Sequence, residues 1–485
     1  MLDKAFKEKL MAIVGQDNVL DSKENQVAFS YDATPGFQSL PDAVVFPGST
    51  EDVQAIVKLC REMKTPIVPR GSGTNLSAGT CPVQGGIVLS FQRMDQILEL
   101  DEENLTLTVQ PGVVTQKICE YVEARGFFYP PDPSSMKIST IGGNIMENSG
   151  GLRGLKYGVT RDYVLGLTVV LANGDILHTG GKLAKDVAGY DLTRLMVGSE
   201  GTLGIVTEAI LKLVPPPPSK MTILSVYESM DDAAETVSAI IAAKIIPATL
   251  EFLDRATIEV VEDYAHVGLP TEAAAILLIE QDGDPEVVKR DIQQIADICR
   301  KHGARSVQTA QTAEEAQALL TARRAALSAC ARKRPTTILE DATVPRSKVA
   351  DMVKAINRIA EKYQLTICTF GHAGDGNLHP TVLTDVRDQD EMARVEKAFQ
   401  EIFATAIELG GTITGEHGVG AMKAPYLKWK IGDSGIRTMQ AIKTALDPDN
   451  LLNPGKLFVP DHANSVGTGN PASAPTQTAE RMMKK

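Results

Sequence analysis

The sequence predicts an α+β protein with two main domains, and three features support this prediction. The chain has 485 residues, of which 43% are apolar, and this is too much for one simple core. Residues 40–214 alternate short β-branched segments with glycine-rich turns, whereas residues 220–424 repeat a strand–helix–strand pattern. Four prolines at 215–218 separate the regions, because such a run can continue neither a helix nor a central strand.

The first region is predicted to begin with a helical segment and to continue as a domain of short strands. Residues 1–39 start with the charged stretch 1–10, which is typical of a helix start. Residues 51–63 have the apolar spacing of an amphipathic helix, and Ser49 and Thr50 can cap it. In the domain that we place at 40–219, the residue types indicate strands at 43–46, 66–69, 86–89, 105–109, 167–171 and 203–207.

The second region, at 220–424, is predicted to form an antiparallel sheet with helices on one face, in the ferredoxin-like style. Its helix at 284–302 has Asp284 as N-cap, Pro285 in the first turn and Gly303 beyond its end. The pattern also predicts helices at 229–243 and 347–363, and strands at 222–226, 248–252, 275–279, 304–308, 336–339 and 365–369. A helical stretch is expected at 425–460, before a disordered tail at 461–485 that is rich in Ala, Ser, Thr and Gly.

Composition and charge argue against several classes of protein. A net charge of −12 without a basic face argues against nucleic acid or an anionic membrane as the main partner. No apolar run approaches the roughly 18 residues of a transmembrane helix, and the charged N-terminus lacks the apolar core of a signal peptide. The six cysteines are scattered without a CxxC pair. This indicates reduced thiols in a cytoplasmic protein, with no iron–sulfur cluster bound through the usual motifs.

Three glycine-rich segments in the first domain, at 69–76, 131–151 and 197–205, indicate an anionic cofactor. Backbone N–H groups that glycines leave accessible can cradle a pyrophosphate. The first segment is neither GxGxxG nor a Walker loop, which disfavours a nicotinamide-binding Rossmann fold. Any one of these segments alone is an ordinary tight loop, but three in one domain favour a large cofactor.

The stretches 371–380 and 415–418 are predicted to form a metal and proton-transfer site. His372 and His379 can each give a neutral imidazole nitrogen to a divalent cation, and Glu416 can add an anionic oxygen. His417 is then left to move protons. Such a ligand set leaves open positions for a substrate. We expect 371–380 to leave a sheet edge, and the plain alternative is a polar turn without a metal.

The order and the amino-acid sequences of these segments resemble those of the FAD-linked oxidases of the vanillyl-alcohol oxidase type. Within them the chain is similar to the branch of D-lactate and glycolate dehydrogenases. The resemblance covers residues 40–458, and its motifs taken together are very specific for this family. Its matching pieces are 69–76, 132–151, 155–158, 189–192, 198–205, 371–379, 415–418 and 453–456.

The resemblance implies a two-part FAD-binding domain at 40–219, a substrate or cap domain at 220–424 that carries the metal site, and a return to the FAD domain at 425–460. The FAD pyrophosphate would lie on residues 70–74. The first glycine loop contains neither histidine nor cysteine, so the FAD is expected to be non-covalent. The implied cofactor-binding residues are Pro69, Arg70, Gly71, Ser72, Gly73, Thr74, Asn75, Asp132, Pro133, Ser135, Ser139, Thr140, Gly143, Asn144, Asn148, Gly150, Glu200, Gly201, Gly204, Ile205 and Asn453.

The same resemblance implies how a 2-hydroxy acid would be oxidised. FAD takes a hydride from C2, and the protein must remove the hydroxyl proton. The implied metal ligands are His372, His379 and Glu416, with zinc or iron as the ion, which would lower the pKa of the hydroxyl. His417 would be the base.

Further residues are implied for binding the substrate. Asn377 would lie beside the substrate or metal, and Arg323 would hold the carboxylate with its guanidinium. The alternative for Arg323 is a solvated surface residue. Arg324 points elsewhere on the same helix, and Lys423 is a weaker candidate.

Substrate and partner follow from smaller details. Leu339 stands where D-2-hydroxyglutarate dehydrogenases carry a lysine two positions before an aspartate, here Asp341. This favours a short acid, D-lactate or glycolate, over D-2-hydroxyglutarate. Electrons would pass to a quinone or a partner, either an iron–sulfur subunit or an electron-transferring flavoprotein as in an electron-bifurcating complex, which would allow peripheral contact with a membrane. A non-catalytic binding module is disfavoured by the intact set of site residues.

Overall fold

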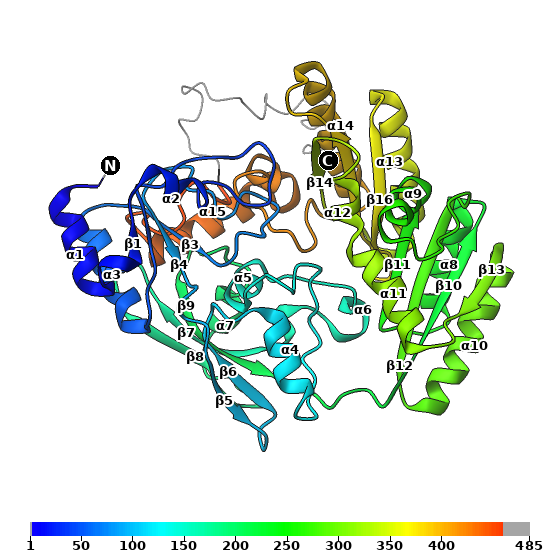
Figure 1. The fold of residues 1–485 in the computed structure, drawn as a ribbon, viewed down its shortest axis with the longest axis horizontal. Coiled ribbons are helices and arrows are strands. Elements are labelled where there is room, and N and C mark those ends of the chain that lie inside the picture. Colours follow the sequence, from blue (N-terminus) through cyan, green and yellow to red (C-terminus); the bar gives the residue numbers. More distant parts are fainter. Residues whose placement is uncertain (1, 459–485) are drawn as a thin grey trace. The chain divides into compact units, whose positions relative to one another are not determined.

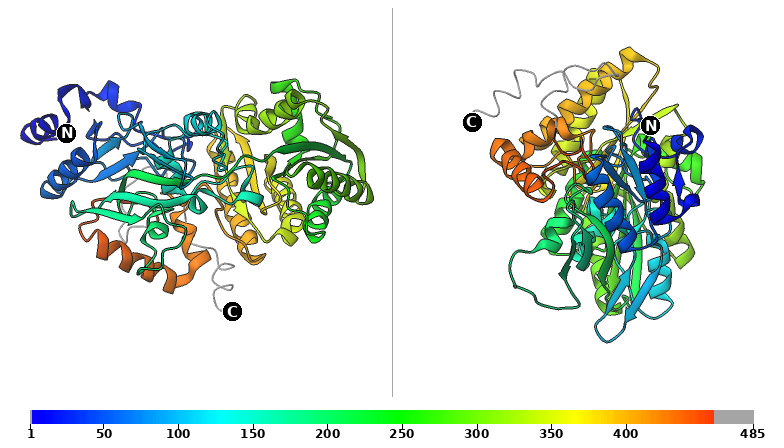
Figure 2. Two further views of the ribbon diagram at one scale, coloured as in Figure 1. Left: turned by 90° about the horizontal axis from the view of Figure 1, so that it is seen from below. Right: turned by 90° about the vertical axis from the view of Figure 1, so that its left-hand side faces the viewer.

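The structure is a computed structural model that describes residues 2–458, so the predicted tail at 461–485 lies outside the described part. The chain forms two compact units. Unit 1 contains residues 2–149, 159–216 and 416–458, and unit 2 contains residues 150–158 and 217–415. Each unit can be followed by colour in Figures 1 and 2. The short segment 150–158 belongs to unit 2, although it lies within the stretch predicted as the first domain.

Unit 1 contains a four-stranded sheet in the order β1-β2-β4-β3. The strands β2, β4 and β3 are parallel, and β1 is antiparallel at one edge. The bounds are β1 (Val19–Leu20), β2 (Ala43–Val45), β3 (Ile67–Arg70) and β4 (Ile87–Ser90). Helix α3 (Thr50–Glu62) connects β2 to β3, as the amphipathic pattern predicted. The Ser49 side chain accepts a hydrogen bond from the Asp52 N–H, which confirms the predicted cap.

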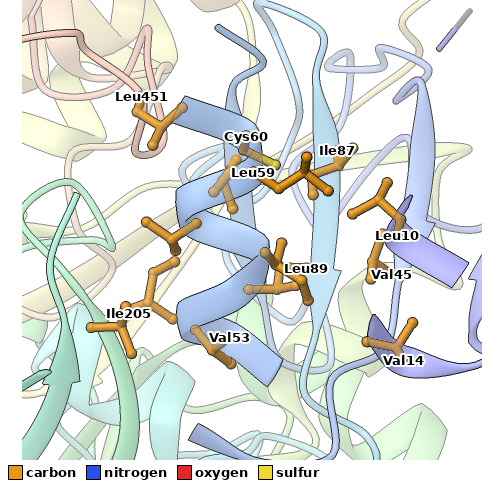
Figure 3. Close-up of a cluster of buried hydrophobic side chains, with 14 of the residues drawn as sticks. Leu10, Val14, Val45, Val53, Leu59, Cys60, Ile87, Leu89, Ile205 and Leu451 are labelled. Atoms are coloured by element: carbon orange, nitrogen blue, oxygen red, sulfur yellow. The ribbon is translucent and has the colours of Figure 1, made fainter. Parts of the chain in front are cut away.

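The core of unit 1 is organised around α3 and contains side chains from several elements. Helix α1 (Lys4–Val14) packs against α3. Figure 3 shows this cluster, to which Leu451 in the loop near residue 450 also contributes. Its labelled members are Leu10, Val14, Val45, Val53, Leu59, Cys60, Ile87, Leu89, Ile205 and Leu451.

A second sheet of unit 1 has five antiparallel strands in the order β5-β6-β9-β7-β8. Their bounds are β5 (Ile97–Asp101), β6 (Thr106–Val109), β7 (Val164–Val170), β8 (Ile176–Gly180) and β9 (Ile205–Lys212). The unit also contains the helices α2 (Lys23–Val27), α4 (Thr115–Glu123), α5 (Ile141–Glu147), α7 (Leu192–Met196) and α15 (Leu427–Leu446). Helix α5 lies inside the glycine-rich segment 131–151, in which no helix was predicted.

The segment after α15 adds to the four-stranded sheet. The Ile67 N–H donates to the Leu451 carbonyl, and the Asn453 N–H donates to the Ile67 carbonyl. Lys443 on α15 donates to the carbonyls of Thr202 and Leu452. These bonds fix residues 451–453 beside β3, at the end of which the first glycine-rich segment begins.

Unit 2 is built on one antiparallel sheet, as predicted. Seven strands follow the order β13-β10-β12-β11-β16-β17-β14, and β15 also pairs with β17. All its strand pairs are antiparallel. The bounds are β10 (Ser219–Tyr227), β11 (Thr249–Asp254), β12 (Ala275–Gly283), β13 (Ala304–Thr309), β14 (Thr336–Leu339), β15 (Ala342–Thr343), β16 (Thr366–His372) and β17 (Asn377–Thr384).

The helices of unit 2 form two groups, whereas we had expected one. The first group is a row of α8 (Met230–Ala242), α10 (Pro285–Lys301), α13 (Val349–Tyr363) and α14 (Gln389–Glu408), in which neighbours contact each other. The second group is α9 (Arg255–Ala265), α11 (Ala313–Arg324) and α12 (Ala326–Cys330). The short helix α6 (Gly154–Tyr157) is held to β12 by Lys156 and by the Tyr157 hydroxyl, both bound to Asp282.

One expectation about unit 2 was wrong. The stretch 371–380 does not leave a sheet edge but forms the hairpin of β16 and β17, inside the sheet. Only the short turn 373–376 is free of strand pairing, and Gly376 in it has a φ of +82° that other residues rarely adopt. Among residues 2–458, no helix is long and apolar enough to cross a membrane.

Candidate active site

The two histidines of the glycine-rich stretch lie on neighbouring strands and on one face of the sheet. His379 is opposite Phe370 in the register of β16 and β17, and His372 is two residues after Phe370. Side chains two residues apart on a strand share a face. The two imidazole rings are accordingly close, with centroids 5.2 Å apart, and both side chains are buried.

His372 is held by a buried carboxylate. Its Nδ1 lies 2.7 Å from Oε1 of Glu251 on β11. Burial alone would raise the pKa of Glu251, but Arg323 and His372 together hold that pKa below its ordinary value. Since an ionised carboxylate can only accept, Nδ1 of His372 carries the hydrogen and Nε2 keeps its lone pair. Nε2 is therefore the atom of His372 suited to bind a cation.

Glu416 supplies the third potential ligand. It directly follows Gly415, whose N–H donates to Oδ2 of Asp341 over 2.8 Å. One potential ligand atom from each of His372, His379 and Glu416 lies within 4.8 Å of the others. Two imidazole nitrogens and one carboxylate oxygen in this arrangement fit a divalent cation with open coordination positions.

Gly415 allows the backbone to approach Asn377. A Cβ at position 415 would lie 2.9 Å from Nδ2 of Asn377 and 2.2 Å from Oγ1 of Thr343. Asn377 is buried and lies opposite His372 in the β16–β17 register. The structure thus places this predicted site residue at the end of the hairpin that carries both histidines.

His417, the predicted base, is adjacent to the potential ligand Glu416. Its Nε2 is 3.6 Å from Oε1 of Glu416. Its carbonyl accepts a hydrogen bond from the Ser77 hydroxyl over 3.1 Å. This bond holds the main chain at His417.

Arg323, predicted to bind a substrate carboxylate, has a protein partner in this structure. Its Nη2 is 2.6 Å from Oε2 of Glu251, and its guanidinium lies over the Phe370 ring at 4.9 Å. It is 3% exposed, so it is not a solvated surface residue. Lys423 is fully buried in unit 1, where its charge interacts with Glu147 and Glu200.

Unit 1 contains a cavity at the place where its three glycine-rich segments meet. The C-terminal end of β3, the first turn of α5 and the turn before β9 all contribute to its wall. Ten residues predicted for the cofactor line it. They are Pro69, Arg70, Gly71, Thr140, Gly143, Glu200, Gly201, Gly204, Ile205 and Asn453.

Glycine is required where these segments touch. A Cβ at Gly71 would lie 2.2 Å from Oγ1 of Thr140. Gly201 has a φ of +68°, and a Cβ there would lie 2.7 Å from Cγ of Pro69. The wall is therefore made of closely packed backbone, which suits the approach of a cofactor's phosphates and ring.

The other predicted cofactor residues do not line the cavity, and several have structural partners. The side-chain amide of Asn75 donates to Glu147, and that of Asn144 donates to Thr115. The Ser72 hydroxyl donates to the Ile138 carbonyl. The full set outside the lining is Ser72, Gly73, Thr74, Asn75, Asp132, Pro133, Ser135, Ser139, Asn144, Asn148 and Gly150, and Gly150 belongs to unit 2.

Sequence reasoning also missed part of the lining. Some of these residues lie within or beside the glycine-rich segments and could have been included. Phe91 and Pro111 follow strand ends without any motif, so no sequence signal marked them. The missed residues are Gly79, Thr80, Phe91, Pro111, Gly142, Met146, Glu147 and Val206.

The ionisable groups of the cavity wall are strongly perturbed. Burial, and then the charges of Glu200 and Asp32, raise the pKa of Glu147 well above its ordinary value. Burial also raises the pKa of Glu200, although its carboxylate accepts N–H bonds from Val419 and Gly420. A raised pKa disfavours the charged form of Glu147, so this carboxyl repels an anionic ligand less than an ordinary glutamate would.

The chain is similar to known proteins over most of its length. Residues 41–180 match the family model of an FAD binding domain, and residues 216–457 match that of the C-terminal domain of FAD linked oxidases. The chain is 68% identical to glycolate oxidase subunit GlcD of Bacillus subtilis (strain 168), over 96% of this chain and 99% of that protein.

A more distant relative and a solved structure extend the similarity. The D-lactate dehydrogenase of Anaerostipes hadrus is 36% identical over 94% of this chain and 97% of that protein. The crystal structure of p-cresol methylhydroxylase with bound substrate has a TM-score of 0.79, at 21% identity, over 94% of this chain and 96% of that one. At this identity, the structural likeness shows the fold alone.

Proposed function

This chain belongs to the FAD-linked oxidases, and from that membership we propose that it oxidises a short D-2-hydroxy acid, D-lactate or glycolate, with the help of a divalent cation. The coarser activity is that of an FAD-dependent oxidoreductase acting on 2-hydroxy acids. The finer proposal rests on one observation, which is the group of His372, His379 and Glu416 with His417 beside it.

In this proposal each part of the site has one role. FAD supplies the hydride acceptor when bound in unit 1. The cation, zinc or iron, would be held by His372, His379 and Glu416, and would supply Lewis acidity that lowers the pKa of the substrate hydroxyl. His417 takes the hydroxyl proton on its imidazole, and Asn377 orients the substrate by hydrogen bonding.

Arg323 remains the proposed partner of the substrate carboxylate. Nη2 of Arg323 lies 2.6 Å from Oε2 of Glu251, whereas its buried Nε has no hydrogen-bond partner among the described residues. A cation held by three protein ligands would keep open positions for the substrate. The cation site and Arg323 would therefore share the binding of the substrate.

The register of β14 supports a short substrate. Leu339 lies opposite Thr381, which is two residues after His379, so all three share the face of the predicted cation site. An apolar side chain at this position offers no partner for a second carboxylate. Leu339→Lys should raise kcat/KM for D-2-hydroxyglutarate and lower it for D-lactate. An unchanged ratio of the two would contradict the assignment of Leu339.

We further propose that the chain hands its electrons to a partner protein, an iron–sulfur subunit or an electron-transferring flavoprotein, or to a quinone. A relative with 68% identity is named as a subunit, and the six cysteines here are buried without disulfides. We place the protein in the cytoplasm, with contact to a membrane only through the partner. Purification with the flavin band as marker tests this, because a self-sufficient oxidase would copurify with no second chain and reduce oxygen rapidly.

The main experiment is anaerobic reduction of the purified protein's flavin. D-lactate, L-lactate, glycolate and D-2-hydroxyglutarate are added in turn, before and after removal of divalent cations with a chelator. We expect bleaching by D-lactate or glycolate, its loss after chelation, and its return with added Zn²⁺. Bleaching that survives complete metal removal would refute the cation's role. Acid precipitation should release the flavin, and colour retained in the pellet would refute non-covalent binding.

A further inference from the structure

A buried chain of three side chains links α11, β11 and β16 in unit 2. Nη2 of Arg323 is 2.6 Å from Oε2 of Glu251, and Oε1 of Glu251 is 2.7 Å from Nδ1 of His372. The three side chains are 3%, 0% and 3% exposed, respectively. The carboxylate thus uses one oxygen for each neighbour, without access to water.

Such a carboxylate is costly unless its partners compensate it. A buried ion needs a counter-ion and hydrogen bonds to offset lost hydration. Its neighbours in β11, Leu250 and Phe252, are apolar and fully packed, and an apolar residue at 251 would avoid this cost. The presence of both Glu251 and Arg323 therefore points to a task other than packing.

The task follows from the direction of the hydrogen bonds. Glu251 accepts from Nδ1 of His372, which fixes one tautomer and the rotation of the ring about its χ2 axis. The lone pair of Nε2 is then aimed from a rigid strand. We propose that Glu251 is a positioning residue that orients His372 for a divalent cation, and that Arg323 serves to balance the charge of Glu251. This inference rests on the cation site of the proposed function.

Arg323 contributes through charge and not through contact with the cation. With Arg323 paired to Glu251, the two charges cancel, and the cation meets the carboxylate of Glu416. Glu251→Gln would remove the hydrogen-bonding anion and leave the guanidinium uncompensated near a dication. The loss of affinity should therefore have two parts, one from orientation and one from charge repulsion.

The experiment measures Zn²⁺ affinity of the FAD-loaded, full-length protein by competition with a chromophoric chelator after metal removal. Glu251→Gln should bind Zn²⁺ about 10–100-fold more weakly than wild type, the range found for the loss of such supporting partners. Glu251→Gln/Arg323→Met removes both charges and should recover part of that loss. The matched control is Glu280→Gln, because Glu280 is a buried carboxylate of the adjacent strand β12 that accepts a hydrogen bond from Thr222. Glu280→Gln should bind Zn²⁺ as tightly as wild type.

The possible results separate this inference from the proposed function. Zn²⁺ binding by wild type with equal affinity in Glu251→Gln would overturn the inference and leave the cation site standing. Failure of wild type itself to bind Zn²⁺ would refute the cation site, before any variant is considered. If Glu251→Gln does not fold, as judged by lost flavin, the double variant decides, since replacing both members of a buried ion pair is tolerated far better than replacing one. Wild-type affinity in the folded double variant would also overturn the inference.

Discussion

Replacing Gly71 with alanine should weaken the unit that holds FAD, through one identifiable steric conflict. The new Cβ would lie 2.2 Å from Oγ1 of Thr140, far inside contact distance, and the backbone at Gly71 is otherwise compatible with alanine. Forcing an extra methyl group into a packed site costs about 1–3 kcal/mol. This corresponds to roughly a 5- to 150-fold smaller equilibrium constant for folding of the unit.

A second substitution tests the cause of the loss. Thr140→Ala removes the clashing oxygen, and the next atom, Cβ of residue 140, is at an acceptable 3.4 Å from the new Cβ. Thr140→Ala alone loses a cap of α5 whose hydrogen bond to the Gly143 N–H is long, at 3.5 Å, so we expect a cost of about 0.5–1 kcal/mol. The double variant should therefore be more stable than Gly71→Ala alone.

The assay is denaturant unfolding of the FAD-free protein followed by circular dichroism, so that substitutions in the cavity wall are compared without the cofactor. Gly143→Ala is the control, because the nearest atom to its new Cβ is at an ordinary 3.5 Å. It should unfold at or above the wild-type midpoint, since alanine replaces glycine within a helix. An unfolding midpoint for Gly71→Ala equal to that of Gly143→Ala, or no recovery in the double variant, would refute the steric reasoning.

Three further predictions concern ionisable side chains. Burial raises the pKa of Asp254 to about 6, so between about pH 4 and 6 the folded state holds a proton that the unfolded state has lost. The free energy of unfolding of the wild type should therefore fall as the pH rises through this range, by roughly 3 kcal/mol relative to Asp254→Asn. Parallel unfolding curves of the two proteins across this range would contradict that. Lys443→Met leaves buried Asp447 without its ammonium partner and should lower the free energy of unfolding by about 3–5 kcal/mol. The measurement is the temperature at which FAD is released on heating. Lys428→Met, which removes an exposed ion pair, should leave that temperature nearly unchanged. His417→Asn should abolish flavin reduction by the substrate while bound FAD and Zn²⁺ affinity persist, and retained reduction would remove His417 as the base.

Much of the fold was predictable because its signals are local. The apolar spacing at 51–63 and the Asp284–Pro285 start are properties of single segments, and α3 and α10 appear where these signals placed them. Helix α5 was missed because Gly142 and Gly143 indicate a turn, whereas packing of Gly142 on Pro111 requires a residue without a side chain within the helix. A strand was predicted at 365–369, within β16, but its pairing with β17 was missed because the glycines of 371–376 interrupt the strand pattern.

The site was only partly predictable for a different reason. His372, His379 and Glu416 stand in glycine-rich motifs that are recognisable from the sequence alone. Glu251 stands in an ordinary apolar strand, and its partner Arg323 is far away in sequence, so only the tertiary structure shows that the two meet. The available signal was a carboxylate between the apolar residues Leu250 and Phe252, because a buried charge requires a partner.

The bonds between β3 and residues 451–453 have a consequence for how the protein is made. The last described residues complete the sheet and supply Asn453 to the wall of the cavity, while β3 itself leaves the ribosome nearly 400 residues earlier by sequence number. Residues 217–415 emerge as a continuous stretch in between and can fold first, since domains fold as they are synthesised. A chain released before residue 451 would lack part of the cavity wall. We expect FAD uptake to mark completed synthesis, so that a ribosome-stalled chain ending before Leu451 remains colourless.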